Sequence, residues 1–389
     1  MQHLSNLVNA RLLMLLLALS VPCASSANSD AERIRSIVDG TIGPMISRHD
    51  VPGMAVALTV DGRSYVFNYG VSSKESQAPV TGSTIFEIGS ISKMFTATLA
   101  ALGHVTGRLS LDEHPGRYLP ELKGRPIDRP TLLHLGTYTA GGLPLQFPDA
   151  VGDDAAVLAY FRGWKSNDPP GTVRQYSNPS IGLLGVVTAA AMKDRFTSLI
   201  ETRLLRKLGM SHTFLKVPPQ AMVDYAWGYR EGKPVRVNPG PLAAETYGIK
   251  STASDMLRFV QANIDPSGLD ASLRKAIGIT QLGQFRVAGM VQGFGWEQFP
   301  YPLSRELLLD GNSEEVIFDP NPALPVVSRR TAESRLFDKT GSTGGFGAYV
   351  VFVPAKRIGL VMLANKNFPI PARIEAAYAI IDQLVPSGR

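Results

Sequence analysis

The two ends of the chain carry mirrored patterns of one helix and one β-hairpin, and this pairing is the strongest constraint on the fold. Near the N-terminus, apolar residues at helical spacing over 31–49 precede two strand-like runs, 53–60 and 64–69. Asp61-Gly62 between the two runs is typical of a tight hairpin turn. The first part of the chain is therefore predicted to form a helix followed by an antiparallel hairpin.

The C-terminal part has the same elements in reverse order. Two apolar runs, 347–353 and 358–364, are separated by a turn over 354–357, and an amphipathic helix pattern over 372–384 closes the chain. Two hairpins flanked by terminal helices predict one antiparallel sheet that both ends of the chain build together.

Helical patterns dominate the residues between the hairpins, separated by loops rich in Pro and Gly. The chain has no internal repeat and no low-complexity tract. These patterns predict an α/β fold of the α+β type, in which an all-helical lobe is inserted into the sheet lobe and the site lies between the two. The predicted helices are 91–105, 155–162, 181–192, 199–208, 255–263 and 272–282.

Residues 1–27 have the features of a secretory signal peptide. Arg11 precedes an apolar run over 12–19, and small residues follow Pro22 as far as Ala27. A membrane anchor is the alternative, but the run is too short to span a bilayer. Cys23, the only cysteine, lies inside this segment, and Pro22 before it disfavours a lipid anchor. We expect residues 28–389 to form one catalytic domain without disulfides in the periplasm.

The formal net charge of +6 is mild, and no block of Lys or Arg stands out. This surplus is compatible with anionic small substrates and gives no support for nucleic-acid binding. We expect a monomer whose partners are small molecules, with no membrane association once the signal peptide is removed.

Three short motifs in fixed order carry the chemistry. Ser-x-x-Lys alone is weak evidence, because a second copy occurs at Ser272 to Lys275, whereas the chain has a single Tyr-x-Asn and a single Lys-[Ser/Thr]-Gly. Together they supply a hydroxyl nucleophile, groups that move its proton, and a cationic strand edge, which indicates acyl transfer through a covalent serine intermediate. The motifs are Ser90-Ile91-Ser92-Lys93, Tyr176-Ser177-Asn178 and Lys339-Thr340-Gly341-Ser342.

Ser90 and Lys93 are predicted to lie one turn apart on the same face at the start of a helix. The helix dipole there favours an alkoxide, and a buried Lys93 could accept the hydroxyl proton. The structural alternative is a Ser that caps the helix beside a solvated Lys.

Tyr176 and Asn178 are predicted in a turn before the helix that begins near Ile181. Nearby ammonium groups would stabilise the phenolate of Tyr176, which could then exchange a proton with Ser90. Asn178 can donate and accept, which suits it to hold Lys93 and a substrate amide. The alternative is that these residues only form a turn.

Lys339 is predicted on a strand edge facing the cleft, where Thr340 and Ser342 offer hydroxyls to a carboxylate and Gly341 allows close backbone approach. The backbone N–H groups of Ser90 and Ser342 could form an oxyanion hole. The six His residues show no metal-ligand spacing, so we expect neither a metal nor a cofactor.

With these motifs, the chain resembles the class C serine β-lactamases, the AmpC-type cephalosporinases, over essentially all of its length after the leader. The segments that carry the resemblance are 86–93, 132–146, 176–178, 225–229, 245–248, 339–342 and 363–367.

The resemblance implies Ser90 as the acylated nucleophile and Lys93 and Tyr176 as the proton-transfer pair, which would also activate water for deacylation. Gln146 and Asn178 would contact the side-chain amide of the substrate. The strand residues Lys339 to Ser342 would line the substrate, with Asn367 and Arg373 near its carboxylate. The substrate-binding residues that the resemblance implies are Gln146, Asn178, Lys339, Thr340, Gly341, Ser342, Asn367 and Arg373.

The chain departs from the family pattern at Ile370, where the family usually has Asn, so direct carboxylate recognition at that position is not expected. Glu245 is expected on a substrate-side loop, and the loops that contain Tyr225 and residues 292–302 are expected around the site. The same fold also serves D-Ala-D-Ala carboxypeptidases, serine esterases and non-catalytic binding modules. The resemblance implies hydrolysis of cephalosporins and penicillins, with a carboxypeptidase or esterase as the alternative.

Overall fold

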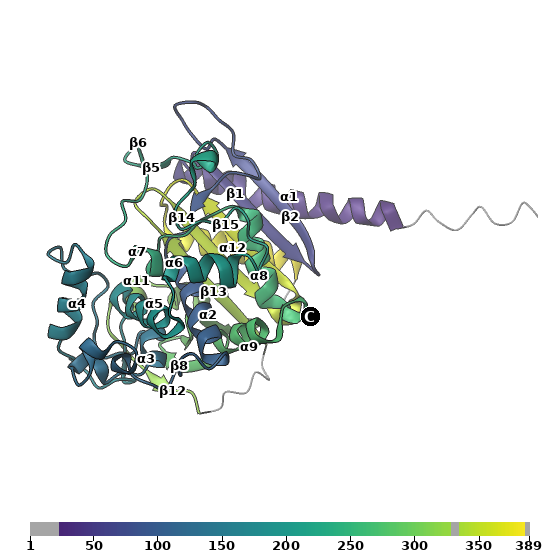
Figure 1. The fold of residues 1–389 in the computed structure, drawn as a ribbon. Coiled ribbons are helices and arrows are strands. Elements are labelled where there is room, and N and C mark those ends of the chain that lie inside the picture. Colours follow the sequence, from purple (N-terminus) through teal and green to yellow (C-terminus); the bar gives the residue numbers. More distant parts are fainter. Residues whose placement is uncertain (1–22, 328–333, 386–389) are drawn as a thin grey trace, which may run out of the picture.

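A nine-stranded antiparallel sheet runs through the protein in the order β12-β8-β9-β10-β13-β14-β15-β1-β2 (Figure 1). This computed structural model describes residues 23–327 and 334–385. The strands are β1 Gly53–Val60, β2 Arg63–Gly70, β8 Gly283–Val287, β9 Met290–Gly293, β10 Glu297–Pro300, β12 Leu324–Pro325, β13 Arg335–Ser342, β14 Gly347–Val353 and β15 Ile358–Ala364.

Both ends of the chain build one side of this sheet together, as predicted. β1 pairs with β15, so that Met54 lies opposite Ala364, and β2 and β14 flank this pair. The turn between β1 and β2 has positive φ at both central residues, 50° at Asp61 and 82° at Gly62. These are the values that a tight hairpin turn needs at its two central positions.

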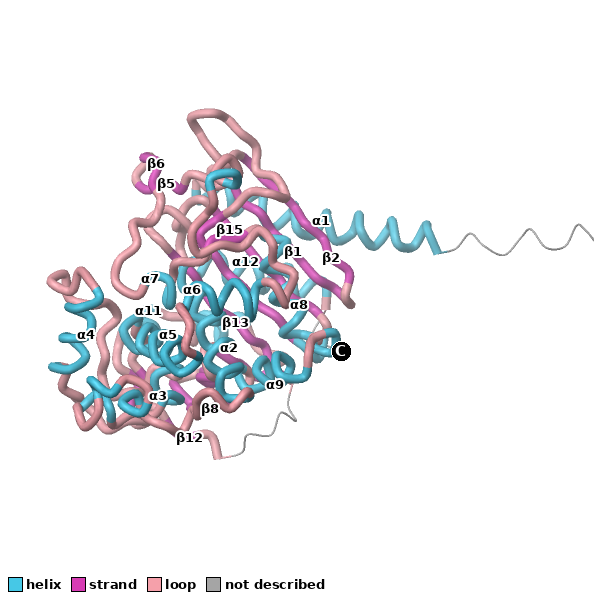
Figure 2. Tube along the Cα trace, viewed as in Figure 1, coloured by secondary structure: helices cyan, strands magenta, loops and turns pink. Residues whose placement is uncertain are grey.

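Strands β1, β14 and β15 are buried on both faces, which explains their continuous apolar sequences. Alternate residues enter two different cores because successive side chains point to opposite faces. Val350 of β14 belongs to the core shared with the helical part, and Val351 belongs to the core under the terminal helices. α1 (Cys23–His49) and α12 (Ile370–Leu384) cover the second face, while α8 (Ala253–Ile264) packs on the first (Figures 1 and 2).

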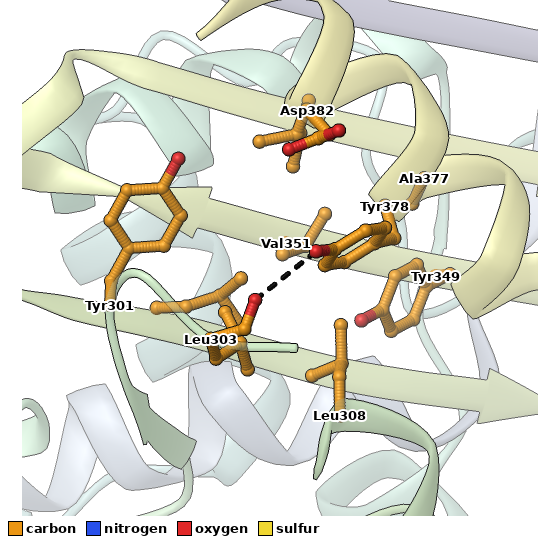
Figure 3. A pocket seen from close by; sticks show the side chains of 10 residues that line it. Tyr301, Leu303, Leu308, Tyr349, Val351, Ala377, Tyr378 and Asp382 are labelled. Carbon is orange, nitrogen blue, oxygen red and sulfur yellow. Dashed lines mark hydrogen bonds between the residues drawn. The ribbon is translucent and has the colours of Figure 1, made fainter. Parts of the chain in front are cut away.

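The contact between α12 and the sheet is close. A small apolar hollow there is lined by Tyr301, Leu303, Tyr378 and their neighbours, and the Tyr378 hydroxyl donates to the carbonyl oxygen of Leu303 over 3.2 Å (Figure 3). Its volume of about 10 Å³ leaves room for no more than about one water. This face of the sheet is therefore a packed layer.

The helical patterns of the middle region are confirmed, with ends shifted by a few residues. The predicted helix over 199–208 is the exception. The short helix α6 ends at Leu199, and a π-helical segment, Ile200–Leu205, follows it directly. The helices of this region and those beyond it are α2 Ser92–Val105, α3 Leu132–Gly136, α4 Asp154–Gly163, α5 Asn178–Met192, α6 Phe196–Leu199, α7 Ala243–Thr246, α9 Ala271–Thr280, α10 Arg305–Asp310 and α11 Glu314–Phe318.

The sequence patterns missed one half of the sheet. Strands β8, β9 and β10 extend it beyond β13, and residues 292–302, expected as a loop, include part of β9 and all of β10. Polar side chains on these strands, such as Gln292 and Glu297, are buried, which breaks the apolar alternation that a strand usually shows. Short paired strands remain outside the large sheet: β3 Phe86–Glu87 with β7 Lys250–Ser251, β4 Val173–Arg174 with β11 Asn321–Pro322, and β5 Gly228–Arg230 with β6 Lys233–Val235.

Residues 1–22 of the expected signal peptide lie outside the described residues. α1 begins at Cys23, before the expected end of the leader at Ala27. Within the described part of the chain, no helix has both the length and the apolar character required to cross a membrane. The signal peptide, its cleavage and the single catalytic domain over 28–389 stay predictions.

Asn365, directly after β15, joins three segments through its buried side chain. Its Oδ1 accepts from the backbone N–H of Gly53 over 2.7 Å, and its Nδ2 donates to the carbonyl oxygens of Val71 and Trp227 over 3.0 Å each. These bonds satisfy one buried backbone group at the start of β1 and two partly buried carbonyl oxygens in loops.

We predict that Asn365→Ala lowers the free energy of unfolding by about 2–4 kcal/mol, because it leaves one buried and two partly buried backbone groups without the partner that Asn365 supplies. Urea unfolding monitored by circular dichroism measures the change. Gln383→Ala, which alters an exposed side chain near the end of α12, is the control and should change the free energy by less than about 0.5 kcal/mol. A loss in Asn365→Ala as small as in this control would contradict the role of Asn365.

Candidate active site

Residues of all three predicted motifs line one cavity of about 510 Å³. Ser90 lies at its base, Tyr176 and Asn178 come from the helical part, and Lys339, Thr340 and Ser342 come from β13. Segments that are far apart in the sequence therefore meet beside β13, an interior strand of the sheet. The other lining residues are Leu145, Gln146, Arg174, Glu297, Ile317, Phe318, Asn367, Phe368, Pro369 and Ile370.

Ser90 sits in a single 3₁₀ turn, Gly89–Ile91, immediately before α2. The Nζ of Lys93 donates to the Ser90 Oγ over 2.8 Å and to the carbonyl oxygen of Thr246 over 3.2 Å. Lys93 is 0% exposed, and the N-cap position of α2 is Ile91, not Ser90. The alternative of a capping Ser beside a solvated Lys is therefore wrong.

Burial is the main influence on Lys93 and lowers its pKa below the ordinary value. The negative charge that Tyr176 can carry opposes this shift, and the positive charge of Lys339 reinforces it. The neutral amine is thus more accessible than in a solvated lysine, which is the form that can accept a proton from Ser90.

The ring of Tyr176 lies between two ammonium groups, with the Nζ atoms of Lys93 and Lys339 each 5.0 Å from its centroid. Burial alone would raise the pKa of the Tyr176 phenol, but the charges of Lys339 and Lys93 outweigh burial and bring it below the ordinary value. The phenolate is therefore a second candidate acceptor for the Ser90 proton.

Asn178 and Gln146 form a polar pair on the helical side of the cavity. The Nδ2 of Asn178 donates to the Gln146 Oε1 over 2.8 Å. Asn178 is the first residue of α5, capped by Ser177, so the helix begins three residues earlier than predicted. The expected contact between Asn178 and Lys93 is replaced by the bonds of Lys93 to Ser90 and Thr246. The buried Oδ1 of Asn178 has no hydrogen-bond partner among the described residues, so its capacity as an acceptor is unused.

Two glycines bring β13 against the turn that holds Ser90. A Cβ on Gly341 would collide with the carbonyl oxygen of Ile88, and a Cβ on Gly89 would lie 2.5 Å from the backbone N of Ser342. Gly89 also has a φ of +53°, in the region that favours glycine. The close approach at Gly341 thus serves packing onto the Ser90 turn, whereas the sequence reasoning assigned it to the ligand.

Lys339 shares a buried carboxylate with Arg174. The Lys339 Nζ lies 3.3 and 3.4 Å from the Glu297 oxygens, and Arg174 donates to the Glu297 Oε1 over 3.2 Å. Burial lowers the pKa of Lys339, but the negative charges of Glu297, Tyr176 and Asp338 together more than offset this and hold it above the ordinary value. Sequence reasoning missed Arg174 and Glu297. No sequence signal marks either residue, because Arg174 ends a two-residue strand and Glu297 begins a strand whose buried polar residues conceal the usual alternation.

Arg373 was expected beside the substrate carboxylate, but the structure places it beneath the cavity. Its side chain is 1% exposed and donates to the carbonyl oxygen of Gly341 over 2.9 Å, the Ser342 Oγ over 3.0 Å and the Asn367 Oδ1 over 2.6 Å. Arg373 therefore fixes two lining residues without facing the cavity itself. Ile370, the first residue of α12, lines the cavity and adds apolar surface at this end.

Glu245 is helical where a loop was expected, whereas Tyr225 lies in a loop, as expected. Glu245 belongs to the helix α7, and its side chain packs against Gly185 of α5, where burial raises its pKa to about 7. The Tyr225 hydroxyl donates to the Oε1 of Glu87 over 2.6 Å in a buried contact. Neither side chain lines the cavity, so both act through packing around the site.

No cluster of three or more His, Cys, Asp or Glu side chains within 23–327 and 334–385 has a metal-binding arrangement. The cavity instead presents a hydroxyl, two buried lysines, a phenol and amide groups. A serine whose proton can pass to a buried amine or phenol defines the class of hydrolases that form a covalent acyl-serine intermediate.

The chain belongs to the beta-lactamase family. The family model described as "Beta-lactamase" matches residues 35–385. The "Beta-lactamase" of Pseudomonas fluorescens is 47% identical over 91% of this chain and 99% of its own, and that of Escherichia coli (strain K12) is 40% identical over 95% and 98%. The resemblance noted from the sequence is thereby confirmed.

Solved structures of similar proteins support the same family assignment. A class C beta-lactamase in complex with cefoxitin has a TM-score of 0.87 at 44% identity, over 91% of this chain and 99% of its own. The D-alanine carboxypeptidase AmpC from Burkholderia cenocepacia has a TM-score of 0.86 at 47% identity over the same shares. The predicted α+β fold with an antiparallel sheet built from both ends is confirmed as the fold of class C beta-lactamases.

We predict that Lys339→Met raises the pKa of Tyr176, because one of the two charges that stabilise the phenolate is lost. The phenolate forms above its pKa, so activity that depends on it should begin at a higher pH. The pH profile of kcat/KM for a β-lactam measures this acid limb. Lys233→Met, at an exposed position of β6, is the control and should leave the limb unchanged. If the acid limb of Lys339→Met lay at the same pH as that of the wild type, this would contradict the claim that the charge of Lys339 lowers the pKa of Tyr176.

Proposed function

We propose that this protein is a class C serine β-lactamase that hydrolyses cephalosporins and penicillins through an acyl-enzyme on Ser90. The observation that carries the proposal is the 2.8 Å hydrogen bond from the buried Lys93 to Ser90 at the base of a cavity that Tyr176 and β13 share. Membership of the beta-lactamase family supports the choice of substrate.

Acylation begins with attack of the Ser90 Oγ on the carbonyl carbon of the lactam ring. The Ser90 proton passes to the Tyr176 phenolate or to the neutral amine of Lys93, and the new oxyanion is held by the backbone N–H groups of Ser90 and Ser342. As the ring C–N bond breaks, the same pair returns the proton to the departing nitrogen. The product of this step is an ester on Ser90.

Deacylation reverses these proton movements with water as the nucleophile. Tyr176 and Lys93 take a proton from water as its oxygen attacks the ester carbonyl, and the proton then returns to the Ser90 Oγ when the C–O bond breaks. The free acid leaves with the ring open, and the enzyme regains its starting state.

The two sides of the cavity divide the recognition of substrate. Asn178 and Gln146 bind the side-chain amide, for which the Asn178 Oδ1 is available as an acceptor. Lys339, Thr340 and Ser342 bind the carboxylate through charge and hydroxyl groups. Asn367 contributes less, because Arg373 already engages its Oδ1, and Ile370 offers only apolar contact.

The predicted signal peptide supports export to the periplasm, and we further propose that the enzyme acts there as a monomer. A D-Ala-D-Ala carboxypeptidase is the second candidate, because one similar solved structure is named a D-alanine carboxypeptidase. The two functions differ in the fate of the acyl-enzyme formed with a β-lactam, which a β-lactamase hydrolyses and a peptidase retains.

Incubation of the purified protein with a chromogenic cephalosporin, followed by both turnover and intact mass, tests the proposal. We expect multiple turnovers and a transient adduct, both lost in Ser90→Ala. Ser272→Ala, in the second Ser-x-x-Lys string at the start of α9, is the matched control and should keep full activity. A stable adduct without turnover would indicate the peptidase, and the absence of any adduct would refute both candidates.

A further inference from the structure

Three charged side chains form a continuous buried chain at the base of the cavity, in the order Arg174, Glu297, Lys339. Arg174 is 1% exposed and its partners only 3% each. Both cations contact the same Oε1 of Glu297, over 3.2 Å from Arg174 and 3.3 Å from Lys339. Burial of this kind is costly unless each charge is compensated, so the arrangement constrains all three positions together.

This charged chain connects the two sides of the site. Arg174 ends β4, two residues before Tyr176, whereas Glu297 begins β10 and Lys339 lies in the adjacent β13. Arg174 also donates to the Gln292 Oε1 over 3.2 Å and to the carbonyl oxygen of Val316. The guanidinium is thereby held by strand β9 and helix α11 as well as by Glu297.

Arg174 in turn supports the phenol. Its Cζ lies 5.5 Å from the centroid of the Tyr176 ring and 5.6 Å from that of Tyr138. The rings of Tyr138 and Tyr176 contact each other at 4.9 Å. Tyr176 therefore packs against the guanidinium of Arg174. Glu297 binds both this guanidinium and Lys339, and so positions both.

We propose that Arg174 and Glu297 are positioning residues for the reaction: together they fix the distance between Tyr176 and Lys339 and keep Lys339 charged beside the phenol. The inference rests on the proposed function, since it assigns roles in that acyl transfer. Neither residue needs to touch the substrate, because both act through Tyr176 and Lys339.

The charge of Lys339 depends on all the titratable groups around it. Glu297, Tyr176 and Asp338 raise its pKa, while burial and Arg174 lower it, and its own charge lowers the pKa of Lys93. Asp338 is a weaker source of negative charge, because burial and Glu297 raise its pKa to about 7. Loss of the Glu297 charge should therefore let Lys339 lose its proton at a lower pH.

Glu297→Gln tests the proposal because it removes the charge and keeps the size of the side chain. We expect kcat for a β-lactam to fall on the order of 10–100-fold with a smaller change in KM, and the alkaline limb of the pH profile to move to lower pH. Arg174→Met should also lower kcat, and Arg174→Lys should recover part of the loss, since it restores the charge without the forked hydrogen bonds.

Asp270→Asn is the matched control. This substitution breaks an exposed ion pair in which the Lys207 Nζ lies 2.6 Å from the Asp270 Oδ2. It should leave kcat and the pH profile unchanged, because exposed ion pairs contribute little. If Glu297→Gln does not fold, the double variant Arg174→Gln/Glu297→Gln removes one charge of each sign and takes its place. Circular dichroism and thermal unfolding confirm that each variant is folded.

The proposal would be overturned if a folded Glu297→Gln kept the wild-type kcat and the wild-type alkaline limb of the pH profile. The same result in the double variant would overturn it if the double variant is the one that folds. A fall in thermal stability alone, with kcat and the pH profile unchanged, would also overturn it, because that is the result of a purely structural role. The wild-type protein in the same assay tests the proposed function separately. If the wild type shows no turnover, it is the proposed function that fails.

Discussion

The site depends on how three buried cations are accommodated around one phenol. Lys93, Lys339 and Arg174 are all within a few per cent of full burial, and Glu297 is the carboxylate that two of them share. Because Glu297 contacts Lys339 and Arg174 but lies further from the amine of Lys93, the two lysines experience different surroundings. One is held as a cation and the other is shifted toward the neutral amine, which gives an acyl-transfer site both an anchor for anions and a base.

The fold brings these groups together through backbone packing. β13 occupies a place inside the sheet, between β10 and β14, and its glycine at 341 lets it press against the turn that carries Ser90. β10 brings Glu297 opposite Asp338, next to Lys339. Arg373 from α12 fixes Ser342 and Asn367 from below. The C-terminal helix, far from Ser90 in the sequence, thus helps to hold the residues that line the cavity.

Sequence reasoning predicted the two hairpins, most helices and the three motifs, because each depends on local periodicity or on residues close in the chain. It missed β8 to β10, whose buried polar residues conceal the usual alternation, and with them Glu297. It also assigned Arg373 to the cavity, since a sequence does not reveal which side of a helix faces the substrate. Arg174 was missed for a related reason: its partners lie more than 100 positions away in the chain.

The most direct test of this account is an NMR titration of the lysine side chains in protein labelled with ¹³C at the ε position. Lys93→Arg and Lys339→Arg variants identify the two signals. The account predicts that Lys93 titrates below the ordinary lysine pKa of 10.5 and Lys339 above it. Titration of the two lysines in the reverse order, or at the same pH, would contradict the division of roles that Glu297 imposes.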